Sequence, residues 1–309
     1  MKKILITTSS FDRDGQPGLA ALAAAGYSIV MNPHGRKLSE DEAAGLLDGD
    51  VVGMVAGTEP LTRRVLAGAK GLKVVSRCGI GLDSVDLAAA GELGIRVLNT
   101  PDAPSLAVAE LALGMILNAL RRIGEADRRL RRGEWKALMG GLLACRTVGI
   151  VGYGRIGRRV ARLAQAFGAR TLAHDAQPFM PDGVAEARDI DSLLAEADVV
   201  SLHLPSVAGG PFMDATRIAA MKPGAILVNT ARGGLVDEAA LAVALQEGRL
   251  AGAALDTYAK EPYAGPLAGI ETAVLTAHMG SYASEARSIM EREAVENLLK
   301  GLAEAGLPT

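Results

Sequence analysis

Short apolar runs alternate with alanine-rich helical stretches along the first hundred residues. Five of these runs have the length and β-branched content of buried strands, namely residues 3–8, 27–31, 50–57, 72–77 and 95–99. Strands that alternate with helices are typical of a parallel sheet covered by helices. This part of the chain is therefore predicted to be an α/β domain by itself.

The alternation starts again at Thr147. Six further runs read as strands, with helical stretches between most of them: residues 147–151, 170–175, 198–204, 224–229, 252–256 and 273–277. Six parallel strands suit a doubly wound dinucleotide fold. Residues 281–306 are strongly helical and follow the last strand, so we expect this helix to return and pack on the first domain.

Composition narrows the function. The chain has 309 residues, 49% of them hydrophobic, and a net charge of −2 with lysine and arginine spread throughout, which does not suit a nucleic acid partner. The apolar run at 105–120 is shorter than the roughly 20 residues of a membrane span and contains Glu110. With no signal peptide and only Cys78 and Cys145, we expect a cytoplasmic protein without a disulfide or metal site.

The segment GYGRIG follows the first strand of the second part and opens a helix. Gly152 would permit a tight turn, Gly154 would let the backbone approach a pyrophosphate, and Gly157 would let the helix pack closely on the strand. A bound pyrophosphate would lie at the positive end of that helix. The cofactor site predicted from this motif comprises Gly152, Tyr153, Gly154, Arg155, Ile156 and Gly157.

Asp175 ends the next strand, 23 residues after Gly152. Its carboxylate can accept hydrogen bonds from the hydroxyls of an adenosine ribose and would repel a 2′-phosphate. The five residues that follow contain no arginine that could hold such a phosphate. NAD is therefore predicted in preference to NADP, and an aspartate that caps a turn is the alternative interpretation.

Hydride exchange with a hydroxy acid requires a cation for the carboxylate and a group that moves the hydroxyl proton. Arg232 follows the strand at 224–229 and stands beside Gly233 and Gly234, which would leave space for a ligand. A guanidinium binds a carboxylate through two parallel hydrogen bonds. Arg232 is therefore the candidate for orienting the substrate.

Four histidines are candidates for moving the proton, since the unperturbed imidazole titrates near neutrality. His34 lies in a turn-like segment, and His174 abuts the acid predicted to bind ribose. His203 ends the third strand, where the adenosine half of a dinucleotide usually passes. His278 follows the last strand, where the two domains should meet.

Six motifs together carry a family resemblance: RCGIGLDSVDL, NTP, GYGRIG, NTARGGLVDEAAL, GAALDTYAKEP and TAHMGS. With them the chain resembles the D-2-hydroxyacid dehydrogenases, especially the phosphoglycerate dehydrogenase-like branch, over nearly its whole length. The resemblance implies an α/β protein in which a Rossmann doubly wound parallel-sheet cofactor domain, 101–282, is inserted into a flavodoxin-like substrate domain, 1–100 and 283–309. It also implies an active site in the cleft between these domains.

The same resemblance implies roles for single residues. Arg232 would bind the carboxylate and carbonyl of the substrate, His278 would be the acid/base, and Glu261 would pair with His278. A carboxylate beside the ring favours its protonated form, so the ring can hand a proton to the carbonyl oxygen as hydride arrives. Asp256 would hold the nicotinamide carboxamide, unless it only caps a turn. Further expected cofactor contacts are His203, Pro205, Ala231 and Gly280, and expected substrate contacts are Thr58, Arg77 and Gly79.

The substrate is expected to be a small D-2-hydroxy acid or its 2-oxo partner. In the first domain, the loop at 56–59 offers Glu59 where a cation would favour a phosphate, which argues against D-3-phosphoglycerate unless Arg77 supplies the charge. Phosphoglycerate dehydrogenation and reduction of glyoxylate or hydroxypyruvate are the alternatives within the class. An NAD-sensing corepressor is the alternative from another class. The apolar helix at 105–120 favours a homodimer.

Overall fold

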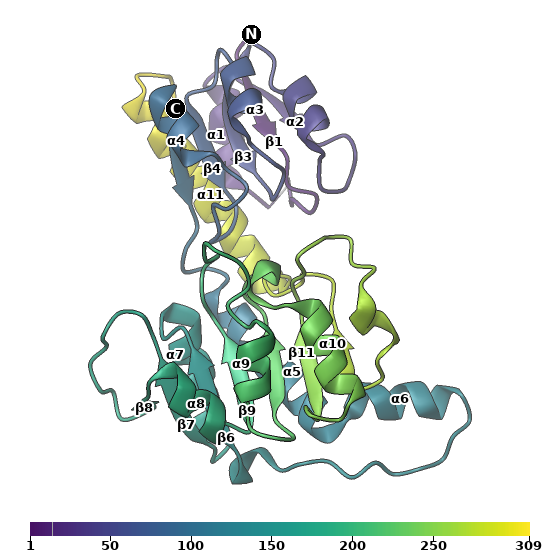
Figure 1. The fold of residues 1–309 in the computed structure, drawn as a ribbon. Coiled ribbons are helices and arrows are strands. Elements are labelled where there is room, and N and C mark those ends of the chain that lie inside the picture. Colours follow the sequence, from purple (N-terminus) through teal and green to yellow (C-terminus); the bar gives the residue numbers. More distant parts are fainter. Residues whose placement is uncertain (14) are drawn as a thin grey trace. The chain divides into compact units, whose positions relative to one another are not determined.

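The structure is a computed structural model that describes residues 1–13 and 15–309, and these form two compact units (Figure 1). Unit 1 comprises Met1–Pro104 and Ser281–Thr309, and unit 2 comprises Ser105–Gly280. The chain therefore leaves unit 1 once, builds unit 2 and returns. The boundaries expected from the sequence, at residues 100 and 282, lie four and two residues from these.

Unit 1 contains a sheet of five parallel strands in the order β2-β1-β3-β4-β5. Its strands are β1 Lys3–Ile6, β2 Ser28–Met31, β3 Val51–Ala56, β4 Val74–Arg77 and β5 Arg96–Asn99. This is the flavodoxin-like strand order. The predicted α/β domain is confirmed, and each strand lies within one of the five apolar runs.

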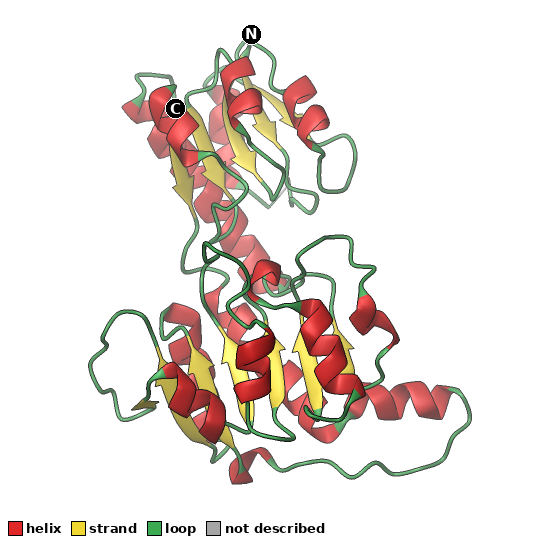
Figure 2. Ribbon diagram, in the orientation of Figure 1, coloured by secondary structure: helices red, strands yellow, loops and turns green. Residues whose placement is uncertain are grey.

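Helices cover both faces of this sheet, as Figure 2 shows. They are α1 Pro17–Ala24, α2 Glu40–Leu46, α3 Arg63–Gly68, α4 Leu87–Glu92 and α11 Ser284–Glu304. Side chains alternate across a strand, so Leu5 packs with α2, α3 and α4 while Ile4 packs with α1 and α11. Short polar side chains start several helices; Ser39 forms a reciprocal capping box at α2.

The last helix completes unit 1, as expected from the sequence. Ser76 Oγ in β4 donates a hydrogen bond to the Ala294 carbonyl in α11, at 2.7 Å. Gly301 lets α11 approach the sheet, because a Cβ there would lie 2.6 Å from Val74 Cγ1. The first and last parts of the chain therefore share one hydrophobic core.

Unit 2 contains a sheet of seven parallel strands in the order β12-β11-β10-β9-β6-β7-β8. Its strands are β6 Thr147–Val151, β7 Arg170–His174, β8 Glu186–Ala187, β9 Val199–Leu202, β10 Ile226–Asn229, β11 Gly252–Leu255 and β12 Ala273–Leu275. This is the doubly wound dinucleotide order with one strand added. Six strands were predicted; the exposed two-residue β8 has no apolar run and was missed.

Two helical layers cover this second sheet (Figure 2). One core cluster joins the sheet to α8 Ile190–Glu196, α9 Ala215–Ala220 and α10 Glu238–Gln246. A second cluster joins the other face to α5 Ser105–Arg121 and α7 Arg155–Ala166. The apolar run at 105–120 is thus a buried helix, and within the described ranges no helix is long and apolar enough to span a membrane.

A short helix, α6 Ile123–Arg131, follows α5 and leads into a long loop that runs to the 3-10 turn Leu143–Cys145 (Figure 1). The loop carries the exposed side chains of Trp135, Met139 and Leu142. Arg128 and Arg132 bond to Glu271, which fixes α6 to the rest of unit 2. The arginine-rich residues that follow α5 therefore lie in α6 and at the start of this loop.

Candidate active site

All strands of unit 2 run in parallel, so the loops that follow them meet at one edge of the sheet. The glycine turn follows β6 and Arg232 follows β10. Glu261 and His278 follow β11 and β12. The topology therefore brings the predicted cofactor turn and the three predicted catalytic residues to the same edge.

Each glycine of the turn has a separate structural reason. Gly152 has a φ of +96°, and a Cβ there would lie 2.6 Å from the carbonyl oxygen of His203. A Cβ on Gly157 would lie 2.0 Å from the Gly152 carbonyl oxygen, so α7 could not pack where it does. At Gly154 nothing lies within 4 Å of an added Cβ. The backbone at Gly154 therefore borders open space, as close approach of a ligand requires.

The N-terminus of α7 suits a pyrophosphate. The N-cap residue of α7 is Gly154, so no side chain caps the first turn. No acidic side chain lies in that turn. The first amide groups of a helix lack intrahelical acceptors and carry partial positive charge. Arg155 is exposed and Ile156 half-buried beside them. The turn and helix end thus fit the phosphates of a dinucleotide.

Asp175 is oriented by the backbone. Its Oδ2 accepts a hydrogen bond from the Tyr153 amide at 2.7 Å, and its Oδ1 accepts one from the Gln177 amide at 2.9 Å. Each carboxylate oxygen has two lone pairs, so each keeps an acceptor site. Asp175 can therefore cap its turn and still accept ribose hydroxyls, which unites the two interpretations of this residue.

The side chain of Tyr153 turns into unit 2. Its hydroxyl bonds to both Asp182 carboxylate oxygens, at 3.1 and 3.0 Å, and the Arg158 guanidinium stacks 4.5 Å from its ring centroid. Burial, with the bond to Asp182, raises the pKa of Tyr153 to about 12. The side chain fixes the loop after Asp175, and what Tyr153 offers toward a cofactor is backbone.

The other expected cofactor contacts differ in their exposure. The His203 ring turns inward, with Nε2 3.0 Å from Ser201 Oγ, and burial lowers its pKa to about 4. This histidine is therefore neutral near pH 7, and its carbonyl is the part that lines the glycine turn. Pro205 is exposed after β9, and Ala231 is half-buried beside Arg232.

Arg232 lies on a loop whose backbone is held by hydrogen bonds from the side chain of Asn229. The Asn229 side chain is fully buried, donates to the Arg232 carbonyl at 2.8 Å and accepts from the Ala231 amide at 3.1 Å. Arg232 itself donates from Nη1 to the Ala231 carbonyl at 2.8 Å. Sequence reasoning did not select Asn229, although an asparagine that follows a buried strand is a recognisable signal for such a turn.

The two glycines after Arg232 serve different purposes. A Cβ on Gly233 would lie 1.8 Å from the backbone carbon of Tyr258, so this glycine allows two loops to touch. Nothing lies within 4 Å of a Cβ on Gly234. The prediction that both glycines leave space for a ligand is therefore wrong for Gly233.

His278 and Glu261 form the pair that the family resemblance implied. His278 Nδ1 lies 3.0 Å from each carboxylate oxygen of Glu261. The side chain of His278 is 46% exposed and that of Glu261 is 28% exposed. The carboxylate therefore fixes Nδ1, and Nε2 is the ring nitrogen left for chemistry.

Asp256 builds the turn that carries His278. It is fully buried, and its carboxylate accepts from Thr276 Oγ1 at 2.6 Å and from the Met279 and Gly280 amides at 2.8 Å each. Its carbonyl accepts from the His278 amide at 2.8 Å. The turn-capping interpretation of Asp256 is thus what the contacts support. Thr276, which sequence reasoning missed, is its side-chain donor.

The backbone of His278 is in the left-handed region, with a φ of +51°. A residue with a Cβ adopts this region at a cost of about 1 kcal/mol. Asp256 accepts four hydrogen bonds from this turn, and these bonds offset that cost. His278 is therefore held in a conformation that its own backbone disfavours.

The expected substrate contacts belong to unit 1. Thr58 is exposed after β3, whereas Gly79 is buried and its amide donates to Thr100 Oγ1 at 2.8 Å. Arg77 is half-buried, and its guanidinium donates to the carbonyl of the adjacent Cys78. Burial raises the pKa of the Cys78 thiol to about 11, which fits a packed side chain and not a nucleophile.

The side chain of Glu59 does not point outward from the loop at 56–59 as expected. It is buried, and its carboxylate accepts hydrogen bonds from the Thr7 hydroxyl and from the Gly57 amide. These bonds turn the side chain inward, because Gly57 and Thr7 follow adjacent strands of the sheet. The expected repulsion between an outward Glu59 and a substrate phosphate is therefore not supported.

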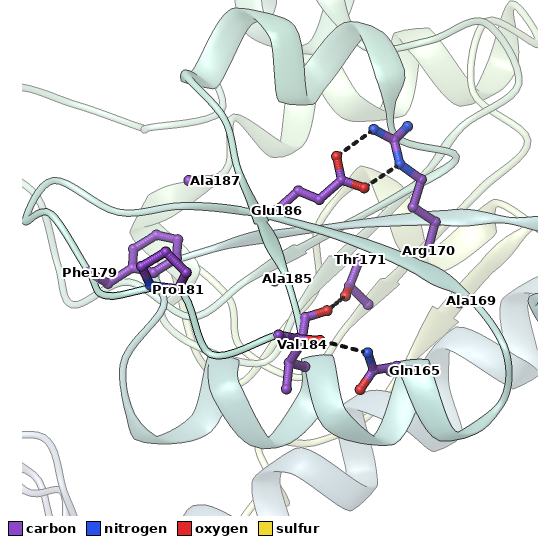
Figure 3. Close-up of a pocket in the computed structure, with 11 residues that line it drawn as sticks. Gln165, Ala169, Arg170, Thr171, Phe179, Pro181, Val184, Ala185, Glu186 and Ala187 are labelled. Atoms are coloured by element: carbon purple, nitrogen blue, oxygen red, sulfur yellow. Dashed lines mark hydrogen bonds and ion pairs between the residues drawn. The ribbon is translucent and has the colours of Figure 1, made fainter.

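A cavity of about 530 Å³ lies elsewhere in unit 2, along β8 and the C-terminal part of α7 (Figure 3). Its polar side chains bond to one another or to backbone: Arg170 to Glu186, Gln165 to the Gly183 carbonyl, and Thr171 to the Val184 carbonyl. Arg170 and Thr171 begin β7, so the cavity borders the amino ends of the strands. It is separate from the edge that carries the predicted site.

Comparisons with known proteins agree with this geometry. The family described as D-isomer specific 2-hydroxyacid dehydrogenase, NAD binding domain, matches residues 113–280. A D-3-phosphoglycerate dehydrogenase of Methanocaldococcus jannaschii is 41% identical over 267 residues, which cover 82% of this chain and 50% of the relative. A hydroxypyruvate reductase of Thermotoga maritima is 38% identical over 272 residues, which cover 86% of this chain and 89% of the relative.

The similarity extends to solved structures. A Thermus thermophilus protein superposes with a TM-score of 0.89 at 39% identity, over 98% of this chain and 97% of that protein. The chain spans about half the length of the D-3-phosphoglycerate dehydrogenases that it matches.

Substitution of the two neighbouring glycines tests the loop contact at Arg232. We expect Gly233→Ala to lower the melting temperature by several degrees, because the new methyl group overlaps the Tyr258 backbone and forces the loops apart. Gly234→Ala is the matched control and should leave the melting temperature within about one degree, since its Cβ meets open space. Equal melting temperatures for the two variants, measured by calorimetry, would contradict the contact.

Proposed function

The chain belongs to the D-isomer specific 2-hydroxyacid dehydrogenase family, and on that premise we propose that it interconverts a small D-2-hydroxy acid and its 2-oxo acid with NAD. The observation that carries the proposal is the His278–Glu261 pair. This pair follows the carboxyl ends of strands in the same sheet as Arg232 and the glycine turn do. A proton carrier, a cation and a dinucleotide cradle are what this reaction requires.

Each of the three predicted catalytic residues has a separate role in the proposed reaction. The Arg232 guanidinium binds the substrate carboxylate and orients the carbonyl. His278 gives a proton from Nε2 to the carbonyl oxygen in reduction and takes it from the hydroxyl in oxidation, while Glu261 holds Nδ1. NAD, when bound, supplies or accepts the hydride.

The glycine turn and Asp175 would hold this cofactor. The first turn of α7 would hold the pyrophosphate, and Asp175 would accept the ribose hydroxyls with the lone pairs that its bonds to backbone amides leave. We propose that Asp256 serves the nicotinamide side indirectly, by shaping the turn from Thr276 to Gly280.

The substrate is a small 2-oxo or 2-hydroxy acid in this proposal. Relatives named hydroxypyruvate reductase and glyoxylate reductase favour a short side chain. The inward turn of Glu59 removes one argument against a phosphorylated substrate, and the half-buried Arg77 supplies a charge in unit 1. We therefore keep D-3-phosphoglycerate as the second candidate, with Arg77 as its phosphate contact.

We also propose a cytoplasmic homodimer. Cys78 and Cys145 are free thiols without a disulfide, which suits a reducing compartment. Nine of the 17 residues of α5 are buried in unit 2, which reduces the surface that this helix offers to a dimer. The loop after α6 is the better interface, with Trp135 92% and Met139 89% exposed. Sedimentation equilibrium measures the resulting mass.

A panel of 2-oxo acids assayed with NADH tests the activity. We expect NADH oxidation with glyoxylate, hydroxypyruvate or a similar short acid, and formation of the D-hydroxy product. His278→Gln should lower kcat by at least about a hundredfold with little change in KM, whereas Arg232→Ala should also raise KM, because it removes the carboxylate contact. Comparison of D-3-phosphoglycerate with D-glycerate, in wild type and Arg77→Ala, decides whether the phosphate is recognised.

Two outcomes would contradict the proposal. Tight NADH binding without turnover of any acid in the panel would favour a binding protein on this scaffold. Wild-type turnover in His278→Gln would remove the histidine from the reaction.

The choice of cofactor gives a separate prediction. We expect wild type to use NADH with at least about tenfold higher kcat/KM than NADPH, because the Asp175 carboxylate repels a 2′-phosphate. Asp175→Asn removes the charge and keeps one acceptor oxygen, although its NH₂ loses one of the two backbone amide bonds, so this variant should narrow the preference for NADH over NADPH. Steady-state kinetics with both cofactors measures this, and equal efficiency in wild type would rule out discrimination by Asp175.

A further inference from the structure

We propose that Tyr258 is a positioning residue, whose hydroxyl clamps together the two segments that carry Glu261 and His278. The proposal rests on the proposed function, since positioning matters only if this pair moves a proton. Tyr258 itself faces inward, is 8% exposed and touches no reacting atom in the assigned mechanism.

The hydroxyl of Tyr258 lies between two backbone carbonyls. It is 2.9 Å from the Leu255 carbonyl at the end of β11 and 2.9 Å from the Thr276 carbonyl just past β12. The Thr276 amide in turn donates to the Leu255 carbonyl at 3.0 Å. The phenol hydroxyl therefore links the ends of two neighbouring strands. Its single proton is shared between the two carbonyls in a three-centre hydrogen bond.

Thr276 is held at three points as a result. Its amide bonds to Leu255, its side chain bonds to Asp256 at 2.6 Å, and its carbonyl bonds to Tyr258. His278 is two residues further along. Loss of the Tyr258 bond therefore frees the carbonyl nearest the start of the histidine turn.

The other partner of the pair depends on the same residue. The Tyr258 amide donates to Glu261 Oε1 at 3.3 Å, and that oxygen is 3.0 Å from His278 Nδ1. The Tyr258 backbone also packs against Gly233, next to Arg232. Tyr258 is therefore in contact with the loops of all three predicted catalytic residues.

The chemistry of the phenol suits this task. Burial, with the nearby charge of Asp256, raises the pKa of Tyr258, so its hydroxyl stays protonated and remains a donor at neutral pH. Its ring stacks on Tyr263 with centroids 4.1 Å apart, which fixes the direction of the hydroxyl. Phenylalanine would keep the ring contacts and lose only the two hydrogen bonds.

Tyr258→Phe and Tyr263→Phe form a matched pair for the test. Each removes one phenol oxygen from the same ring stack, with Tyr258 buried and Tyr263 half-buried. The Tyr263 hydroxyl accepts from the Leu267 amide at 3.1 Å and bonds to neither carbonyl that Tyr258 holds. Calorimetry first establishes that both variants are folded. Activity is measured with NADH and the best acid of the panel.

The decisive readout is nuclear magnetic resonance of protein that carries 15N-histidine and is saturated with NADH. The chain has four histidines, so His278→Gln assigns the Nδ1–H signal of His278. We expect Tyr258→Phe to speed exchange of this proton with water by about tenfold and to lower kcat by about tenfold, with KM for NADH within about twofold. Tyr263→Phe should leave both the exchange rate and kcat near wild type.

Wild-type exchange and kcat in Tyr258→Phe would overturn the inference. Equal effects of the two variants would also overturn it, because they would indicate general loosening of the loop. Failure of the proposed function is separate: it appears as full turnover in His278→Gln, and the exchange measurement does not depend on turnover.

Discussion

The buried carboxylate of Asp256 is the interaction on which the rest of the predicted site depends. Three donors converge on it from the loop after β12, and its own carbonyl accepts a fourth hydrogen bond from the amide of His278. A buried carboxylate is costly unless its oxygens are bonded, so the loop and the carboxylate stabilise each other. These hydrogen bonds stabilise the turn in which His278 adopts a left-handed backbone conformation.

The parallel sheet of unit 2 extends this constraint to the other residues. Since β10, β11 and β12 are neighbours in the sheet, Arg232, Glu261 and His278 follow adjacent strands although they lie up to 46 residues apart in sequence. The glycine turn after β6 is brought to the same edge by the strand order. Two further residues fix the loops through hydrogen bonds. Asn229 bonds to the Arg232 carbonyl, and Tyr258 bonds to the Thr276 carbonyl between the loops of Glu261 and His278.

Much of this arrangement was predictable from the sequence, because it depends on period and punctuation. Buried parallel strands are continuous apolar runs, and the glycines at 152 and 157 each meet a steric requirement that the structure shows. The pairing of His278 with Glu261 came from family resemblance, since the two residues lie 17 positions apart in the sequence. The inward turns of Glu59 and Tyr153 were not predictable, because a polar side chain on a loop gives no sign of which distant partner it finds. The strand β8 was missed for a related reason, as two exposed residues form no pattern.

The most direct test of this account is the turnover of Asp256→Asn. An amide has one acceptor oxygen where the carboxylate has two, so its NH₂ would face the Met279 amide in one orientation and the Gly280 amide in the other. Asp237→Asn is the control, since asparagine also caps a helix and Asp237 caps α10 in the same unit. The account predicts that folded Asp256→Asn loses at least about tenfold in kcat while Asp237→Asn stays near wild type. Wild-type turnover in Asp256→Asn would contradict it.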